Sequence, residues 1–173
     1  MKKLFYPHFI ALLFVAPSCL ADTPGEVKVG KQLRTVNMHG LNVDDRHLDT
    51  YRGKPLIINV WASWCGPCRA EMQSLEKLAN KYDKKQLSLI GVSTDDFRNR
   101  AQDLIKETGI TFDNYIDKKL VLENMLGANR IPLTLLIDKD GKVLKKFNGS
   151  LNWNNPMMIK LIAKILELEL VEG

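Results

Sequence analysis

The chain has 173 residues, enough for one domain with its own hydrophobic core. Hydrophobic residues make up 45% of it and charged residues 26%, which excludes an intrinsically disordered chain. The formal net charge of +5 is spread along the sequence without a basic stripe interleaved with aromatic residues, so no nucleic-acid partner is expected.

Residues 1–21 have the layout of a secretory signal peptide. Two lysines precede a mostly apolar stretch over residues 4–16, and the small side chains of Cys19 and Ala21 suit cleavage after Ala21. Cleavage would remove two lysines and no acid, which lowers the net charge from +5 to +3. We expect export, most simply to a bacterial periplasm, a compartment that permits disulfides.

Two alternatives for this segment stay open. It could be retained as a membrane anchor facing the periplasm, although its apolar stretch is short beside the roughly 20 residues of a transmembrane helix. It could also be a lipoprotein signal, because residues 16–19 weakly resemble the sequence in which a cysteine, here Cys19, becomes lipidated. Lipidation of Cys19 would tether the protein to the membrane.

The first part of the mature chain predicts a leader and then strands. Residues 22–32 are expected to form an exposed leader, followed by a domain over residues 33–173. Alternating apolar and polar residues over 33–38 predict a half-buried strand, and residues 43–51 predict a short strand or a helical turn. The nearly continuous apolar run at 56–62 predicts a central strand covered on both faces.

Helices and strands alternate after this point. A helix with one apolar face is predicted over residues 67–82, followed by a second core strand at 87–93. The next helix, 96–107, is expected to take Thr94 or Asp95 as its N-cap. It should stop at Gly109.

The last third predicts a short extended piece, a helix, a hairpin and a closing helix. The expected elements are an extended piece at 111–116, a helix at 118–126 between Asp117 and Gly127, and strands at 133–137 and 142–147 joined by an Asp-Gly turn. Asn155 and Pro156 begin the final helix. Its predicted buried face comprises Met158, Leu161, Ile162, Ile165 and Leu168. This order predicts an α/β fold with a mixed sheet flanked by helices on both faces.

The cysteine count points to chemistry. After cleavage at Ala21, Cys65 and Cys68 are the only cysteines left, and a disulfide that closes so short a loop stabilises little through chain entropy. A structural zinc site would need four ligands, and the histidines form no matching pair, so no metal is expected. The pair itself is then the redox group, and no other cofactor is expected.

The position of the pair assigns a role to each cysteine. A cysteine at a helix N-terminus lies in the positive end of the helix dipole, which favours the thiolate. Cys65, on the outer side of the turn, is the expected nucleophile, and Cys68, one turn inside the helix, is the expected resolving thiol. Gly66 and Pro67 set the geometry of the ring. Trp64 is expected to shield the pair and to offer an apolar docking surface.

Two motifs carry a resemblance to a known family. Asn-Val-Trp-Ala-Ser-Trp-Cys-Gly-Pro-Cys-Arg-Ala-Glu over residues 59–71 resembles the active site of the exported thioredoxin-fold proteins of the TlpA, ResA and DsbE group. Ile-Pro-Leu-Thr-Leu-Leu-Ile-Asp over residues 131–138 is similar to the second signature of that group. The resemblance covers roughly residues 30–170 and implies a thioredoxin-like fold with a short N-terminal β extension.

The resemblance also implies roles for further residues. It implies a cis peptide bond before Pro132, with the backbone of Ile131 free to pair with an extended substrate strand. Glu71 matches an acid that influences proton transfer at the cysteines, although it could also be a solvated helix carboxylate. Asn59 replaces the buried Asp of cytosolic thioredoxin, and Leu133 replaces the Thr common after the proline. A thiol peroxidase is disfavoured, because Ala62 stands where such enzymes have a Thr.

The leading hypothesis is a periplasmic thiol–disulfide oxidoreductase that reduces disulfides in exported proteins. The Gly-Pro dipeptide resembles that of thioredoxin, whose potential is about −270 mV, whereas a strong oxidant lies near about −120 mV. The resemblance implies a membrane electron donor of the DsbD or CcdA kind and a client such as apocytochrome c. Two other functions stay open: an oxidant or isomerase of folding proteins, and a non-catalytic chaperone or copper metallochaperone with the same fold.

Overall fold

The computed structural model describes residues 25–170, so the predicted signal peptide lies outside the described residues. Twelve elements follow in chain order, including one 3-10 helix, η1. Their bounds are β1 Asn37–Gly40, β2 Arg46–His47, η1 Leu48–Tyr51, β3 Leu56–Trp61, α1 Gly66–Lys81, β4 Ser88–Ser93, α2 Arg98–Thr108, β5 Asp113–Ile116, α3 Val121–Leu126, β6 Leu133–Ile137, β7 Val143–Asn148 and α4 Pro156–Leu166.

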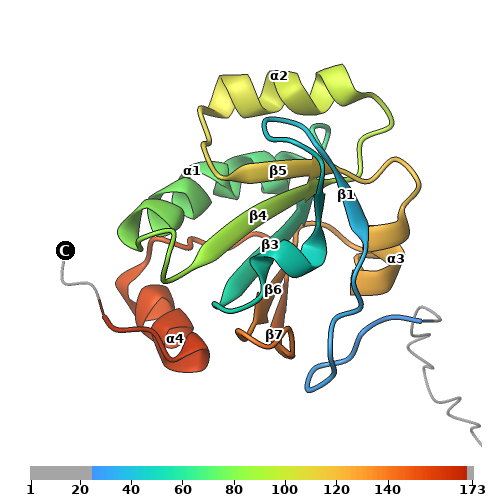
Figure 1. Cartoon of the computed structure of the whole chain (residues 1–173). Helices are drawn as coiled ribbons and strands as arrows, with labels where there is room; N and C mark the ends of the chain where they lie inside the picture. Colours follow the sequence, from blue (N-terminus) through green and yellow to red (C-terminus); the bar gives the residue numbers. More distant parts are fainter. Residues whose placement is uncertain (1–24, 171–173) are drawn as a thin grey trace, which may run out of the picture.

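A seven-stranded mixed sheet, in the order β2-β1-β5-β4-β3-β6-β7, forms the centre of the fold (Figure 1). β3, β4 and β5 are parallel, because a helix connects each strand to the next. β6 pairs antiparallel with β3 and β7 antiparallel with β6, and β1 and β2 extend the other edge in antiparallel pairs. This is a thioredoxin-like α/β fold, as predicted.

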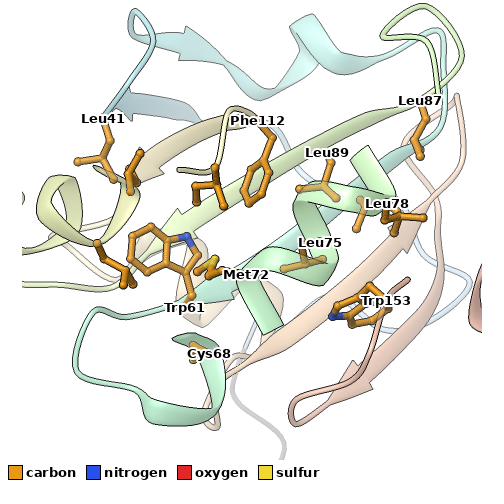
Figure 2. Packing of buried hydrophobic residues seen from close by; sticks show 14 of the residues in the cluster. Leu41, Trp61, Cys68, Met72, Leu75, Leu78, Leu87, Leu89, Phe112 and Trp153 are labelled. Atoms are coloured by element: carbon orange, nitrogen blue, oxygen red, sulfur yellow. The ribbon is translucent and has the colours of Figure 1, made fainter. Parts of the chain in front are cut away.

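The sheet separates two hydrophobic clusters, and successive residues of β3 alternate between them. Ile57 and Trp61 belong to the cluster that α1, α2 and α4 cover, whereas Ile58 and Val60 belong to the cluster on the other face, under α3 and η1. Figure 2 shows Cys68 at one end of the first cluster, with Met72 and the leucines of α1 following it along the helix. The redox helix is therefore anchored by the core over its whole length.

The predicted central elements are confirmed. β3, α1, β4, β6 and β7 lie within one or two residues of their predicted bounds. Asn155 caps α4 by accepting a hydrogen bond from the Met157 amide, and Gly109 ends α2 in the left-handed conformation. The alternatives for residues 43–51 both occur, since β2 runs directly into the 3-10 helix η1.

Three local predictions are wrong. The first strand lies at Asn37–Gly40 rather than 33–38, because Leu33 instead packs in the second cluster. α2 begins at Arg98 without a side-chain cap, and the Asp95 carboxylate bonds to Ser63 and Ser93. The predicted buried face of the last helix is wrong at Leu161, which is 41% exposed. Ile162 is buried, and the other predicted residues pack partly buried against the first cluster: Met158, Ile165 and Leu168.

Most of residues 25–32 are exposed, as expected of a leader, but the segment is attached to the rest of the chain. Val27 is buried in the second cluster, and its amide donates a hydrogen bond to the Met125 carbonyl. The carboxylate of Glu26 pairs with Lys146 at 2.6 Å, with both side chains mostly buried. This segment is fixed to α3 and β7, so it belongs to the folded domain.

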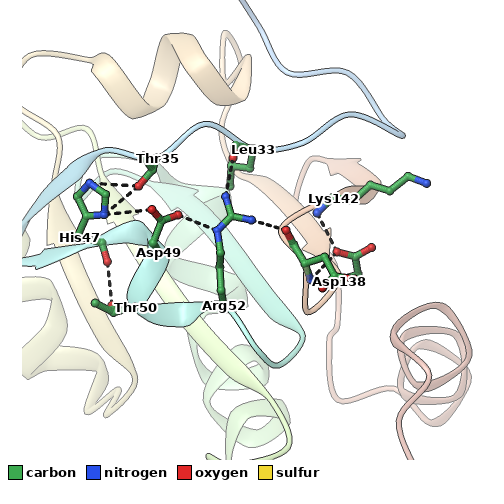
Figure 3. A network of polar contacts seen from close by, with 9 residues as sticks. Leu33, Thr35, His47, Asp49, Thr50, Arg52, Asp138 and Lys142 are labelled. Carbon is green, nitrogen blue, oxygen red and sulfur yellow. Dashed lines mark hydrogen bonds and ion pairs between the residues drawn. The ribbon is translucent and has the colours of Figure 1, made fainter.

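A network of polar contacts centred on Arg52 also attaches the N-terminal segment to the domain (Figure 3). Arg52 pairs with Asp49 at 2.7 Å and also donates hydrogen bonds to the carbonyls of Leu33 and Asp140. The Asp138 carboxylate accepts hydrogen bonds from the backbone amides of the hairpin turn that contains Asp140. Arg52 therefore joins the N-terminal segment, η1 and the β6–β7 hairpin.

Gly91, in the middle of β4, has no room for a side chain. A Cβ there would lie 2.0 Å from Asn114 Oδ1 and 2.7 Å from Trp61 Nε1, two buried groups that hydrogen bond to each other.

We expect Gly91→Ala to lower the free energy of unfolding by about 2–3 kcal/mol, measured by urea denaturation of the oxidised protein. Gly66→Ala is the control, since a Cβ at Gly66 meets no atom within 4 Å. Equal effects of the two changes would contradict this account.

Candidate redox-active site

The redox pair lies where β3 ends and α1 begins. Cys65 and Cys68 form a disulfide, with their Cα atoms 5.3 Å apart. Cys65 is the N-cap of α1, and its sulfur accepts a hydrogen bond from the Cys68 amide at 3.2 Å. Pro67 occupies the first turn, where its missing N–H leaves no bond unmade. The Cys65 sulfur thus lies at the positive end of the helix dipole, which favours a thiolate after reduction.

The two cysteines differ in their access to solvent. Cys65 is 5% exposed and Cys68 is fully buried. A partner thiol or disulfide can therefore reach the pair only at Cys65, in agreement with the order of attack expected from the sequence. Gly66 and Pro67 between the cysteines are exposed, and Trp64 is 72% exposed. This exposure of Trp64 suits a docking surface better than a shield over the disulfide.

The predicted proline faces the pair. The Ile131–Pro132 peptide bond is cis, as expected, and β6 begins at the next residue. The carbonyl oxygen of Ile131 lies 3.8 Å from the Cys65 sulfur, although 66 positions separate the two residues. Backbone polar groups at the start of β6 therefore lie beside the sulfur that a substrate would reach.

Glu71 is buried beneath the helix, with 1% of its surface exposed. Its Oε1 accepts a hydrogen bond from Asn59 Nδ2 at 2.8 Å, and its Oε2 accepts from Trp153 Nε1 at 2.9 Å and the Leu151 amide at 3.1 Å. The alternative of a solvated helix carboxylate is therefore wrong. Burial raises the pKa of Glu71 above its ordinary value of 4.5, while the hydrogen bonds from Trp153, Leu151 and Asn59 oppose the rise.

Asn59 links this carboxylate to the sheet. Its Nδ2 group also donates to Thr134 Oγ1 at 2.9 Å, and its own Oδ1 is buried without a hydrogen-bond partner. A second buried acid at this position would face Glu71 as a like charge, whereas the amide donates a hydrogen bond to it. Asn59 is thus one of the three groups whose hydrogen bonds make a buried carboxylate at position 71 compatible with the core.

The sequence alone did not reveal Trp153, Leu151 or Thr134 as parts of this site. The first two lie in the loop between β7 and α4, about 80 positions beyond Glu71. No local pattern marks them, because only the fold brings this loop against α1. Within residues 25–170, no group of three or more His, Cys, Asp or Glu side chains is placed to hold a metal ion.

A cysteine pair at a helix N-terminus, beside a cis-proline on a mixed sheet, defines the thioredoxin-like class of thiol–disulfide oxidoreductases. Residues 28–162 match the Redoxin family, and the chain belongs to it. Two curated relatives are both named thiol-disulfide oxidoreductase ResA. The protein from Geobacillus thermodenitrificans is 31% identical over 125 residues, 72% of each chain, and that from Halalkalibacterium halodurans is 27% identical over 82% of this chain and 77% of its own.

Solved structures share the fold of this chain. A Chlorobium tepidum protein described as thiol:disulfide interchange protein DsbE superposes with a TM-score of 0.74 at 24% identity, over 81% of this chain and 99% of its own. A Bacteroides thetaiotaomicron protein described as a protein disulfide isomerase gives 0.70 at 26% identity, over 82% and 91%. The chain is a thiol–disulfide oxidoreductase of the ResA type.

The raised pKa of Glu71 predicts a particular pH dependence of stability. A carboxyl whose pKa is raised on folding stabilises the fold fully below its unfolded pKa, near 4.5, and loses that contribution as the pH rises through the folded value. We therefore expect the unfolding free energy of the oxidised wild type to fall relative to Glu71→Gln above this pH, by at most about 1.4 kcal/mol per pH unit. Urea denaturation over a pH series measures the difference.

Glu76, on the same helix, provides the control with the opposite sign. Burial would raise its pKa, but hydrogen bonds from Thr111 and Asn80 outweigh burial and lower the pKa. The contribution of Glu76 to the unfolding free energy is present above pH 4.5 and lost as the pH falls. The unfolding free energy of the wild type should therefore rise relative to that of Glu76→Gln as the pH rises. The account of Glu71 would be wrong if both variants gave the same trend.

Proposed function

We propose that this protein is an exported reductant of disulfides in other exported proteins, working in the periplasm. The observation that carries the proposal is the asymmetry of the pair: Cys65 is the only one of the two sulfurs that a partner can reach, and Gly66-Pro67 between the cysteines resembles thioredoxin. The predicted signal peptide over residues 1–21 supports export. A tether through lipidated Cys19, or a retained anchor, would leave the domain in the same compartment.

The chemistry proceeds in two exchanges. The Cys65 thiolate attacks one sulfur of the substrate disulfide, which breaks the substrate S–S bond, forms a mixed disulfide and releases one substrate thiolate. The Cys68 thiolate then attacks the Cys65 sulfur, restores the Cys65–Cys68 disulfide and releases the second substrate sulfur. Two electrons pass from the dithiol to the substrate. A membrane donor of the DsbD or CcdA type would return them.

The surroundings of the pair suit this sequence of steps. An extended substrate segment would pair with the backbone of Ile131 beside cis-Pro132, while Trp64, Gly66 and Pro67 form the exposed rim around Cys65. Glu71, which has a raised pKa, is the buried group that would accept the proton of Cys68 before the second exchange. Apocytochrome c is the client that the resemblance to the ResA and DsbE group favours.

No helix within the described part of the chain has both the length and the apolar character that crossing a membrane requires.

The equilibrium of the cysteine pair with glutathione gives its reduction potential, which tests whether the protein acts as a reductant. We expect a reduction potential below about −220 mV, on the side of thioredoxin, because Gly-Pro separates the cysteines. The ratio of dithiol to disulfide in glutathione buffers of known composition measures it. A value near about −120 mV would contradict the reductant and favour an oxidant of folding proteins.

Trapping of mixed disulfides tests the order of attack. In Cys68→Ala the second exchange cannot occur, so we expect covalent complexes at Cys65 to accumulate in the periplasmic fraction and to be released by dithiothreitol. Mass spectrometry of these complexes would identify the clients and the donor. Cys65→Ala is the matched control and should trap at least tenfold less. Equal trapping by the two variants would show that Cys65 is not the attacking sulfur.

A further inference from the structure

A second buried carboxylate, that of Asp95, hydrogen bonds to Ser63, two residues before Cys65. Asp95 follows β4 and is 2% exposed. Its Oδ2 accepts hydrogen bonds from the Ser63 amide at 2.9 Å and from Ser93 Oγ at 2.7 Å, and its Oδ1 accepts from Ser63 Oγ at 2.6 Å. The mechanism described above uses none of these contacts.

Ser63 is held at three of its polar groups. Asp95 accepts from its amide and its hydroxyl, and the Arg69 guanidinium of α1 approaches its carbonyl at 3.4 Å. Trp64 and Cys65 follow directly, and the Cys65 amide closes the turn by donating to the Ala62 carbonyl at 3.1 Å. The bonds at Ser63 therefore fix the turn that delivers Cys65 to the start of α1.

The bonds to Ser63 hold the carboxylate of Asp95 near the turn that leads to Cys65. Consecutive Cα atoms lie about 3.8 Å apart, so the Cα atoms of Ser63 and Cys65 are within about 8 Å of each other. The carboxylate of Asp95 is bonded to the first of these two residues, and salt screens the charge of a buried group less than that of an exposed one. All three side-chain and backbone donors to Asp95 described above are neutral, so its charge is not cancelled by an ion pair among them.

The other charged groups around this turn neither neutralise the negative charge of Asp95 nor add a second buried one. Arg69 forms a salt bridge at 2.7 Å with Glu107 of α2, which offsets its positive charge. Asp96 is exposed to solvent, where its charge is screened, and Arg98 donates a hydrogen bond to the Gly40 carbonyl of β1. The dipole of α1 favours the Cys65 thiolate, whereas a buried anion near the turn would oppose it. Asp95 is bonded to this turn through Ser63, whereas Glu71 is bonded to Asn59, Trp153 and the Leu151 amide.

We propose that Asp95 is a positioning residue for Cys65, which holds the Ser63–Trp64 turn in place and, through its negative charge, makes the Cys65–Cys68 pair more strongly reducing. A nearby anion destabilises the thiolate of the reduced form, and a less stable reduced form gives up its two electrons more readily. This deepens the proposed function, since it concerns the same pair, but it does not depend on the direction of electron flow in the cell.

The charge is tested with Asp95→Asn. The reaction measured is protein disulfide plus two glutathione thiols giving protein dithiol plus glutathione disulfide, which balances two electrons and two protons. Removing the charge should shift its equilibrium constant about three- to tenfold toward the protein dithiol and lower the pKa of Cys65, read from the ultraviolet absorbance of its thiolate. Asp96→Asn is the charge-matched control and should stay within twofold of the wild type.

Asp95→Glu separates charge from packing. It keeps the negative charge, so we expect its equilibrium constant and Cys65 pKa to lie closer to wild type than those of Asp95→Asn, even if its stability falls. Equal shifts in Asp95→Asn and Asp95→Glu, or no difference between Asp95→Asn and Asp96→Asn, would overturn the electrostatic role. A wild-type potential in the oxidant range would contradict the proposed reductant while leaving this comparison intact.

The positioning role has its own variant, which keeps the fold and the charge. Ser63→Ala removes the 2.6 Å bond to Asp95 and leaves the bond from Ser93. At a pH above the Cys65 pKa, where the thiolate is fully formed, we expect its attack on a small aromatic disulfide to be several-fold slower than in the wild type. A wild-type rate would overturn the positioning role, whatever the behaviour of the Asp95 variants.

Discussion

The junction between β3 and α1 fixes where the two sulfur atoms lie. β3 is buried along its whole length, and α1 is anchored on the core through Met72, Leu75 and Leu78. The chain has only the short stretch from Ala62 to Cys65 in which to turn from one element to the other. Cys65 is therefore placed at the helix N-terminus by two rigid elements, and the reactivity of its thiolate follows from that placement.

Two buried carboxylates flank this junction, and both are satisfied by neutral donors. Glu71 accepts hydrogen bonds from Asn59, Trp153 and the Leu151 amide, and Asp95 accepts from Ser63 and Ser93. Hydrogen bonds from neutral groups reduce the free-energy cost of burying a carboxylate and leave its charge in place. A salt bridge would instead cancel that charge. Each acid is therefore held in its place by neutral groups, Glu71 on α1 and Asp95 in the loop after β4.

Remote segments complete the site. The loop before β6 brings the Ile131 carbonyl to Cys65, the loop after β7 brings Trp153 to Glu71, and the loop after β4 brings Asp95 to Ser63. These loops meet because β6 and β4 both pair with β3, the strand that precedes the cysteines. The strand order of the sheet is thus what assembles the surroundings of the disulfide.

The sequence by itself determined the elements whose signals are local. The apolar run of β3, the periodicity of α1, the Asp-Gly hairpin turn and the spacing of Cys65 and Cys68 each depend on neighbouring residues, and all were predicted. The cis peptide before Pro132 was predicted from the resemblance to a known family. Tertiary structure alone decided the hydrogen-bond partners of Glu71, the bonding of Asp95 to Ser63 and the attachment of residues 25–32 to the domain. These features depend on hydrogen bonds between residues that are far apart in the sequence, for example Glu71 and Trp153, which are 82 positions apart. A buried polar side chain needs such a partner, and only the folded sheet brings the two residues within hydrogen-bond distance.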